Sequence, residues 1–376
     1  MKVLLLSAYA ARSHVYWQQG LQAMFASWHW TVLSLPPRHF SWRVRGNPLY
    51  WAISERDSLE QGYDLLVATS MVDLATLRGL VPDLASVPAV VYFHENQFAY
   101  PLHRQQKSLL EAQMVSLYSA LAADQILFNS SYNLNSFLAG CTSLLGKLPD
   151  CVPPGVVAKL QEKAAVLPVP LAADLPVAGP AAWPGAGQST DRPLRLLWVG
   201  RFEYDKGGDG LWQILQRLES AELNYELAVI GQQFRNSPDV FGQIERDFAH
   251  RLVQFGYVES TRAYHGILQG ADMVLSTALH EFQGLAVLEA VALGCVPVVP
   301  DRLAYPEIYP AQYRYASSPE DLCQEAAAAV DLIRIQSRGV KQGSVPAPDV
   351  ATYTSEQLQP RYLQTLLATA DAQHSQ

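Results

Sequence analysis

Short, almost continuously apolar runs alternate with longer stretches of helical pattern along most of the chain, and this alternation constrains the fold more than any other feature. The runs in the first half are KVLLLS, WTVLSL, DLLVAT, AVVYFH and QILFNS, with a helical stretch at Gln106 to Ala123. Strands that are apolar on both faces are typical of parallel sheets covered by helices on both sides. The first half is therefore predicted to form a doubly wound α/β lobe.

The alternation stops in a segment rich in Ala, Pro and Gly and then starts again with LRLLWVG, YELAVIG, LVQFGYV, MVLSTA and VPVVP. A polar break at Gln336 to Asp349 precedes a helical pattern at Ser355 to Ala370, which could pack on either lobe. The predicted parts are a first lobe over 1–171, a linker over 172–192, a second lobe over 193–350 and a C-terminal helix over 351–376. Two Rossmann-like lobes of this kind are expected to face a central cleft that holds the ligand.

Length and composition fit this two-lobed α/β interpretation. The 376 residues exceed what one core usually organises, and 49% are hydrophobic. The net charge of -8 argues against a protein that coats nucleic acid over its whole surface, so any such contact should be local. Four cysteines without a CxxC pair suggest neither a disulfide framework nor a zinc site and suit a reducing cytoplasm.

The sequence gives no sign of export or of a membrane anchor. The opening run MKVLLLS is too short for a signal peptide, and no segment approaches the length of a membrane span. A cytoplasmic protein without membrane contact is therefore expected.

The stretch HEFQGLAVLEAVALGC contains two carboxylates in different settings. Between Leu285 and Leu293 only Glu289 is not apolar, so a helix there would be buried all round with one carboxylate that needs a partner, either a ligand hydroxyl or a structural ion pair. Glu281 precedes the expected helix start at Gly284 and should lie on a loop. Backbone N–H groups at such a start attract phosphates.

Two cations follow the run LLWVG. Arg201 and Lys206 lie in one glycine-containing loop, an arrangement that suits a diphosphate, although loop cations are more often solvated. The run VVYF ends in His94, Glu95 and Asn96, and His94 is either structural or catalytic.

Longer strings carry a family resemblance. They are YFHENQFAYP, FNSSYN, STALHEFQGLAVLEAVALGC, AYPEIYPAQYRY and LPPRHFSWRVRGN, and together they resemble the tRNA-queuosine α-mannosyltransferase family. That family is similar to the retaining glycosyltransferases of GT-B architecture, whose hallmark is two glutamates separated by seven residues, like Glu281 and Glu289. The resemblance implies a hexosyltransferase that modifies tRNA by moving mannose from GDP-mannose to the cyclopentenediol of queuosine in the anticodon loop.

The resemblance also implies roles for individual residues. The implied catalytic set is His94, Glu281, Arg201 and Lys206; the implied donor contacts are Arg201, Lys206, Glu281, Gln283, Gly284 and Glu289. Glu281 would contact the donor sugar, Glu289 the ribose, and the two cations the diphosphate. Because Arg201 and Lys206 can stabilise the departing diphosphate, no metal or other cofactor is expected. The sequence names no obvious nucleophile, so we expect attack on the same face without a covalent sugar intermediate.

The acceptor contacts implied in the first lobe are Ser13, His14, Arg38, His39, Trp42, Arg43, Arg45 and Asn96. Ser13 and His14 match the family, whereas Ala10, Ala11 and Arg12 replace the glycines or acidic residue common there. Ser13 is also a natural helix N-cap.

The stretch RHFSWRVRGN is unusually basic for an acidic chain. Its arginines could neutralise a few phosphates of one RNA loop, while His39, Phe40 and Trp42 could stack on unpaired bases. The alternative is that the rings belong to the core and the arginines pair with acidic neighbours.

The sequence leaves two other functions open. A GT-B transferase acting on a lipid or polysaccharide would require a membrane-facing amphipathic helix in the first lobe, and none is persuasive. A protein that binds RNA or nucleotide-sugars without turnover is the non-enzymatic alternative. No motif identifies the donor base or sugar, and a nicotinamide oxidoreductase is disfavoured because the GxGxxG fingerprint is missing.

Overall fold

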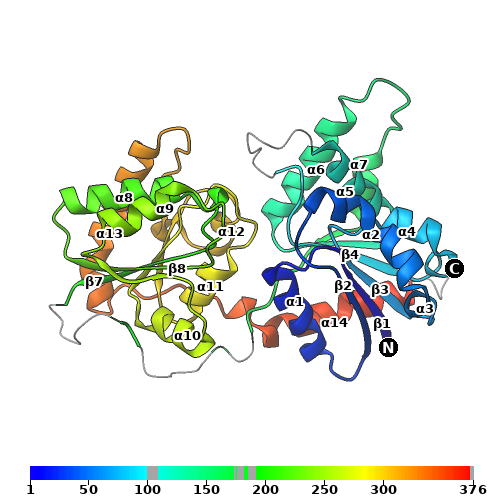
Figure 1. Cartoon of the computed structure of the whole chain (residues 1–376), viewed down its shortest axis with the longest axis horizontal. Coiled ribbons are helices and arrows are strands. Elements are labelled where there is room, and N and C mark those ends of the chain that lie inside the picture. The colour runs from blue at the N-terminus through cyan, green and yellow to red at the C-terminus, as the bar shows by residue number, and fades with distance from the viewer. Residues whose placement is uncertain (100–108, 173–174, 176–181, 185–191, 373–376) are drawn as a thin grey trace. The chain divides into compact units, whose positions relative to one another are not determined.

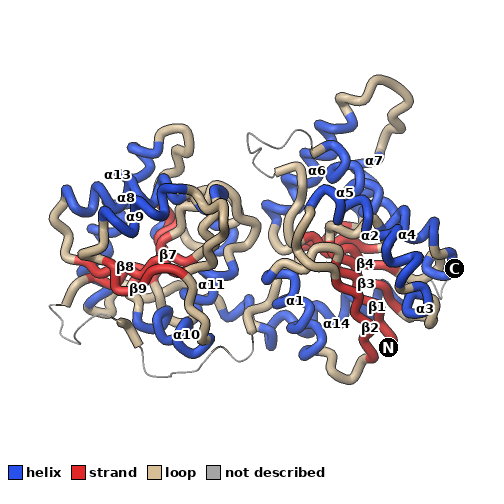
Figure 2. The backbone as a smooth tube through the Cα atoms, in the orientation of Figure 1, coloured by secondary structure: helices blue, strands red, loops and turns tan. Residues whose placement is uncertain are grey.

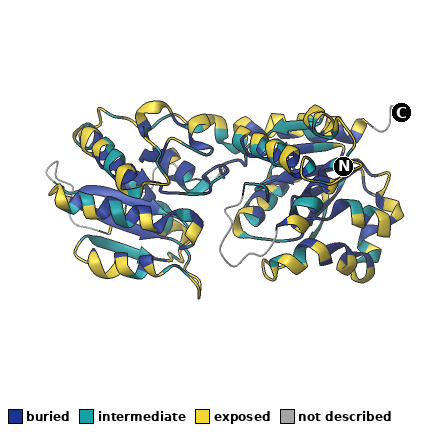
Figure 3. Cartoon of the chain, turned by 90° about the horizontal axis from the view of Figure 1, so that it is seen from above, coloured by how far each residue is buried: buried dark blue, intermediate teal, exposed yellow. Residues whose placement is uncertain are grey.

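The computed structural model describes residues 1–99, 109–172, 175, 182–184 and 192–372. Contacts divide the chain into two units, Met1–Pro170 with Tyr353–Gln376, and Leu171–Thr352. Each unit contains a six-stranded sheet flanked by helices (Figures 1 and 2). The strands are largely buried and the helices expose their outer faces (Figure 3). The predicted α/β class is confirmed.

The first unit has a parallel sheet in the order β2-β1-β3-β4-β5-β6. Its strands are β1 (Lys2–Ser7), β2 (His29–Ser34), β3 (Leu65–Thr69), β4 (Ala89–Phe93), β5 (Gln125–Phe128) and β6 (Ala164–Val166). The apolar runs predicted the first five within two residues at each end. The sequence analysis missed β6 because it is three residues long and only partly buried.

Helices cover both faces of this sheet. They are α1 (Arg12–Met24), α2 (Phe40–Ser54), α3 (Arg56–Leu59), α4 (Leu74–Leu80), α5 (Leu110–Ala122), α6 (Ser131–Leu145), α7 (Val156–Glu162) and α14 (Ser355–Asp371), with a 3-10 turn at Pro82–Leu84. Alternate strand residues such as Leu4, Leu66 and Val91 join a core with α2, α4, α5, α6 and α7. The opposite face receives α1 and α14 (Figure 1). The C-terminal helix thus packs on the first unit.

The second unit has the sheet order β12-β11-β10-β7-β8-β9, again parallel. Its strands are β7 (Leu194–Val199), β8 (Tyr225–Ile230), β9 (Leu252–Gly256), β10 (Met273–Leu275), β11 (Val296–Pro300) and β12 (Arg314–Tyr315). The two-residue β12 was not predicted.

Figure 1 shows α8 (Gly208–Ser220), α9 (Asp239–Asp247) and α13 (Leu322–Lys341) on one face of this sheet. The other face carries α10 (Thr261–Gly270) and α11 (Leu285–Ala292). Shorter elements are α12 (Tyr305–Ile308) and 3-10 turns at Tyr204–Lys206, Ala311–Tyr313 and Ala351–Tyr353. The predicted break at Gln336 begins too early, because α13 continues to Lys341 and buries Gln336.

Two loops of the second unit approach each other closely at Gly207, which precedes α8 with φ +69°. A Cβ atom there would lie 1.9 Å from the carbonyl oxygen of Thr277, in the loop after β10. No side chain fits that gap without moving backbone. The glycine therefore allows the loop after β7 and the loop after β10 to lie side by side.

This contact predicts unequal effects of two glycine substitutions. Gly343 has a similar φ of +72° but open space around its Cβ position, so Gly343→Ala should lower the free energy of unfolding by about 1 kcal/mol through backbone strain alone. Gly207→Ala adds the clash with Thr277 and should cost about 3 kcal/mol or more. Urea unfolding measures both, and equal losses would contradict the tight loop contact.

Candidate active site

The central strands of the second unit place two loops at one edge of the sheet. β7 and β10 are hydrogen-bonded neighbours, with Trp198 opposite Leu275, and the strand order reverses between them. Ligands of open α/β sheets bind outside the carboxyl ends of the strands at such a reversal. The loops that follow, 200–207 and 276–284, contain Arg201, Lys206 and Glu281.

Backbone hydrogen bonds join the two loops. The N–H groups of Leu279 and His280 donate to the carbonyl of Asp205 at 2.9 and 3.1 Å. The hydroxyl of Thr277 donates to the carbonyl of Lys206 at 3.0 Å and accepts from the indole N–H of Trp198 at 3.1 Å. The loops are therefore held as one rigid surface.

Lys206 and Glu281 form an ion pair across these loops. Nζ of Lys206 lies 2.9 Å from Oε2 of Glu281, 3.4 Å from Oδ2 of Asp205 and 3.3 Å from the carbonyl of His280. Burial alone would lower the pKa of Lys206, but the charges of Glu281 and Asp205 raise it above its ordinary value. Burial, together with the charge of Lys206, lowers the pKa of His280 to about 4. The lysine is charged and the histidine neutral at physiological pH.

Glu281 also occupies the backbone N–H groups that lead into α11. Its Oε1 accepts from Phe282 N–H at 3.1 Å and from Gln283 N–H at 3.5 Å, just before Gly284 caps the helix with φ +75°. Burial would raise the pKa of Glu281, but Lys206 and the Gly284 N–H hold it below its ordinary value. The expected anion at this helix start is thus, in the free protein, the chain's own carboxylate.

Arg201 is the more open of the two cations. Its guanidinium contacts Glu203 at 2.5 Å and Asp205 at 3.5 Å, yet 46% of its side chain is exposed, compared with 17% for Lys206. The two cations therefore offer different access, one at the surface and one within the paired loops.

Glu289 lies on α11 and Glu281 on a loop, as predicted. The expectation that this helix is buried all round is wrong, because Leu285, Ala286 and Glu289 are partly exposed and Ala292 is exposed. Glu289 accepts a hydrogen bond from the hydroxyl of Tyr264 on α10 at 2.9 Å. Burial raises the pKa of the Glu289 carboxyl, and the Tyr264 hydrogen bond partly offsets this.

The first unit brings His94, from the end of β4, against His14 of α1. Their rings stack with centroids 4.2 Å apart, and both residues are buried. Burial lowers the pKa of His14 to about 4; burial and the neighbouring His14 hold the pKa of His94 well below its ordinary value. Both rings are therefore neutral at physiological pH.

Two of the acceptor residues implied by the resemblance, Asn96 and Ser13, do not have the surroundings that the sequence suggested. Asn96 is 1% exposed; its amide nitrogen donates to Asn133 and Ser136, and its oxygen accepts from two backbone N–H groups. Its polar atoms are already used inside the unit, so the acceptor assignment of Asn96 is corrected to a structural one. Ser13 is not the N-cap, because α1 begins at Arg12 after Ala11; it lies exposed in the first turn.

The basic stretch is largely at the surface. Arg38, His39 and Trp42 are exposed, and the Trp42 ring lies over Gly46, where a Cβ would come within 2.5 Å of it. Arg45 pairs with Asp73 at 2.6 Å while remaining 52% exposed.

The remaining members of this stretch are less open. Arg43 is partly buried. Phe40 packs edge-on against Tyr9 with centroids 5.9 Å apart and contacts the core. Phe40 therefore packs against the core and is not placed to stack on a base, contrary to the sequence prediction. Trp42 is exposed and can still stack on one.

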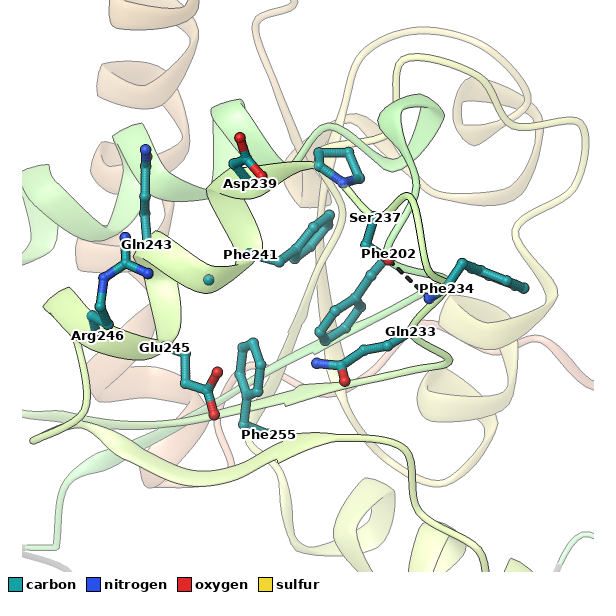
Figure 4. A pocket seen from close by; sticks show the side chains of 12 residues that line it. Phe202, Gln233, Phe234, Ser237, Asp239, Phe241, Gln243, Glu245, Arg246 and Phe255 are labelled. Carbon is teal, nitrogen blue, oxygen red and sulfur yellow. Dashed lines mark hydrogen bonds between the residues drawn. The ribbon is translucent and has the colours of Figure 1, made fainter.

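The pocket in Figure 4 lies elsewhere in the second unit and has a volume of about 460 Å³. Phe202, Phe241 and Phe255 form its aromatic side, and Gln233 and Arg246 lie among its polar residues. None of the predicted site residues lines it.

Among the residues that the structure describes, no group of three or more His, Cys, Asp or Glu side chains is placed to hold a metal ion. In the same part of the chain, no helix combines the length and apolar character needed to cross a membrane.

Sequence reasoning missed two tyrosines and one aspartate of the site. Tyr264 supplies the partner of Glu289, and Tyr305 contacts Ser276 with hydroxyl oxygens 2.6 Å apart. Asp205 also holds Leu279 and His280 through its backbone carbonyl, a contact that no sequence motif reveals. The AYPEIYP string, already noted for its resemblance, was the available signal for Tyr305.

Comparisons with known proteins agree with the two-unit organisation. Residues 2–171 match the family described as tRNA-queuosine alpha-mannosyltransferase N-terminal, and residues 193–334 match glycosyl transferases group 1. The Drosophila melanogaster tRNA-queuosine alpha-mannosyltransferase is 34% identical over 290 residues, covering 76% of each chain. A Xanthomonas campestris GDP-mannose:cellobiosyl-diphosphopolyprenol alpha-mannosyltransferase is 24% identical over 40% of each.

Solved structures share the fold over nearly the whole chain. Anabaena HepE in complex with UDP and glucose superposes with a TM-score of 0.68 at 13% identity, covering 98% of this chain and 100% of that one. Sucrose-phosphate synthase from Thermosynechococcus elongatus gives a TM-score of 0.65 at 14% identity, covering 100% and 98%. At these identities the likeness concerns the fold alone.

The Lys206–Glu281 pair predicts a pH-dependent loss of stability in Lys206→Met. The pKa of the paired Glu281 is lower in the folded chain than its ordinary value of about 4.3. The carboxylate therefore stabilises the fold when the pH is above that ordinary value. This contribution is lost as the pH falls through the lowered pKa of the folded protein. Without Lys206 the partly buried carboxylate loses its ion-pair partner, so the variant should lose about 2 kcal/mol of unfolding free energy at pH 7.5 and less at pH 4.

Urea unfolding of Lys206→Met at both pH values tests this prediction. The double variant Lys206→Met with Glu281→Gln removes both charges and should recover most of the loss at pH 7.5. A loss that is the same at both pH values, or no recovery in the double variant, contradicts the pairing.

Proposed function

The chain belongs to the tRNA-queuosine alpha-mannosyltransferase family, and from this membership we propose that it transfers mannose, with retention, from GDP-mannose to the cyclopentenediol of queuosine in the anticodon loop of tRNA. The observation that carries the proposal is the 34% identity to the Drosophila enzyme over 76% of both chains.

The donor identity is supported by more distant relatives. The Xanthomonas and Mycobacterium tuberculosis mannosyltransferases that match about a third to two fifths of the chain are named as GDP-mannose enzymes. The group 1 glycosyltransferase match covers residues 193–334, most of the second unit, and includes Arg201, Lys206 and Glu281. We assign donor binding to these paired loops.

The proposed chemistry uses fixed charges. The bond between the anomeric carbon and the diphosphate oxygen breaks, and a queuosine hydroxyl attacks the same face while passing its proton to the departing diphosphate. Arg201 and Lys206 stabilise the negative charge of that leaving group, aided by backbone N–H groups near Gln283 and Gly284. Glu281 contacts the sugar and Glu289 the ribose. Two cations suffice in this scheme, so no metal ion or other cofactor takes part.

The first unit is assigned to the acceptor. Its match to the N-terminal domain of the tRNA-modifying family covers residues 2–171, which include His94, His14 and the basic stretch. His94 is proposed to contact the sugar near the reacting carbon. Arg38, Arg43, Arg45, His39 and Trp42 would hold phosphates and an unstacked base of the loop. Since tRNA is the substrate, the enzyme is expected to act in the cytoplasm.

The alternatives are less well supported. The lipid-linked mannosyltransferases match about a third to two fifths of the chain at 24–29% identity, whereas the tRNA enzyme matches three quarters at 34%. A binding protein without turnover is less well supported, because the relative that is 34% identical over three quarters of the chain is a mannosyltransferase.

The decisive assay offers queuosine-containing tRNA and separate nucleotide-sugars to the full chain. GDP-mannose should add one hexose to the queuosine nucleoside, detected by mass after digestion, and EDTA should not lower the rate. Lys206→Ala should reduce turnover by about 100-fold or more, because it removes a transition-state charge contact. Transfer from UDP-glucose alone, or none with queuosine tRNA, would refute the proposal.

The basic stretch predicts a change in the salt dependence of tRNA binding. Arg38→Gln should reduce the slope of log K against log salt by about 1, because one phosphate contact is lost. Arg56→Gln on α3 is the matched control, since this partly exposed arginine already pairs with Glu60, and its slope should stay that of the wild type. Equal slopes for Arg38→Gln and wild type would remove Arg38 from the RNA contact.

A further inference from the structure

The ring of His94 is held without hydrogen bonds. The residue is 6% exposed, and neither ring nitrogen has a hydrogen-bond partner. Because both nitrogens are buried and lack a hydrogen-bond partner, the ring takes its orientation from packing alone. Whatever fixes the surrounding rings therefore fixes the direction in which His94 presents those nitrogens.

Three rings surround His94. His14 stacks on it, Trp17 meets it edge-on with centroids 4.8 Å apart, and Tyr92 lies 4.7 Å away. Trp17 and Tyr92 also contact each other at 4.3 Å. These rings come from α1 and β4, so their relative position depends on how α1 is held against the sheet.

One hydroxyl from the C-terminal helix links these rings to the rest of the unit by hydrogen bonds. The Tyr362 oxygen on α14 accepts from the indole N–H of Trp17 at 3.0 Å, donates to the carbonyl of Pro168 at 3.0 Å and lies 3.4 Å from the Tyr92 hydroxyl. Tyr92 in turn donates to the carbonyl of Leu167 at 2.7 Å. All of these groups lie in the first unit.

We propose that Tyr362 is a positioning residue for His94: its hydroxyl fixes Trp17, and Trp17 with Tyr92 fixes the ring of His94 for mannosyl transfer. This rests on the proposed function of His94. Tyr362 lies on α14, which follows the second unit in the chain and packs on the first. This helix therefore supports the active site in addition to completing the fold of the first unit.

The test is Tyr362→Phe in the full chain, with Tyr313→Phe as matched control. Tyr313 is buried in the second unit, and its hydroxyl donates to a carbonyl, that of Pro346, at 2.8 Å. Tyr362→Phe should lower kcat for mannose transfer about tenfold with KM for GDP-mannose within about twofold, because misplacing a reacting-centre contact acts on the transition state. Tyr313→Phe should leave both within about twofold.

A double-variant cycle separates positioning from general damage. In a His94→Ala background, Tyr362→Phe should change kcat less than about twofold, since its effect passes through His94. A kcat in Tyr362→Phe equal to that of Tyr313→Phe, or a tenfold loss that persists in the His94→Ala background, would overturn the inference.

A second readout needs no turnover. The NMR signals of the His94 ring, assigned by their loss in His94→Ala, should shift in Tyr362→Phe and stay fixed in Tyr313→Phe. Unshifted signals in Tyr362→Phe would overturn the inference even in a protein that transfers no mannose. A wild-type chain inactive on queuosine tRNA would instead refute the proposed function.

Discussion

The ion pair between Lys206 and Glu281 is the interaction on which the second unit's site depends. Removing two opposite charges from water is costly, and the pair persists because the surrounding backbone holds both side chains in place. Gly207 allows the two loops to touch, and the carbonyl of Asp205 accepts from both Leu279 and His280. A cation and a carboxylate that are far apart in sequence thereby form one prepared surface.

In the free protein the carboxylate of Glu281 takes the place that we assign to the negative charge of the bound diphosphate. Glu281 occupies Lys206 and the N–H groups before α11. A diphosphate that reaches Lys206 would share its charge with Glu281, and the carboxylate could then accept from sugar hydroxyls. The pair would keep two partly buried charges compensated until the donor arrives. In the first unit the principle is different, because His94 is placed by packed rings and one distant hydroxyl.

Features that depend on local sequence pattern were predicted correctly. Apolar runs located the longer strands, and the position of Gly284 correctly separated Glu281 on a loop from Glu289 on a helix. Local pattern failed where long-range contacts decide: Asn96 looked like a cleft residue, but Asn133 and Ser136 occupy it. Short strands such as β6 carry too few residues for a periodicity, and a partner 345 residues away, as Tyr362 is from Trp17, leaves no trace in spacing.

The central claim is that the donor nucleotide binds to the loops joined by Lys206 and Glu281. Hydrogen–deuterium exchange of the full chain with and without GDP tests it most directly. The account predicts slower amide exchange in residues 200–207 and 276–288 when GDP is present. Protection confined to residues 232–246, around the aromatic pocket beside α9, with both loops unchanged, would contradict it.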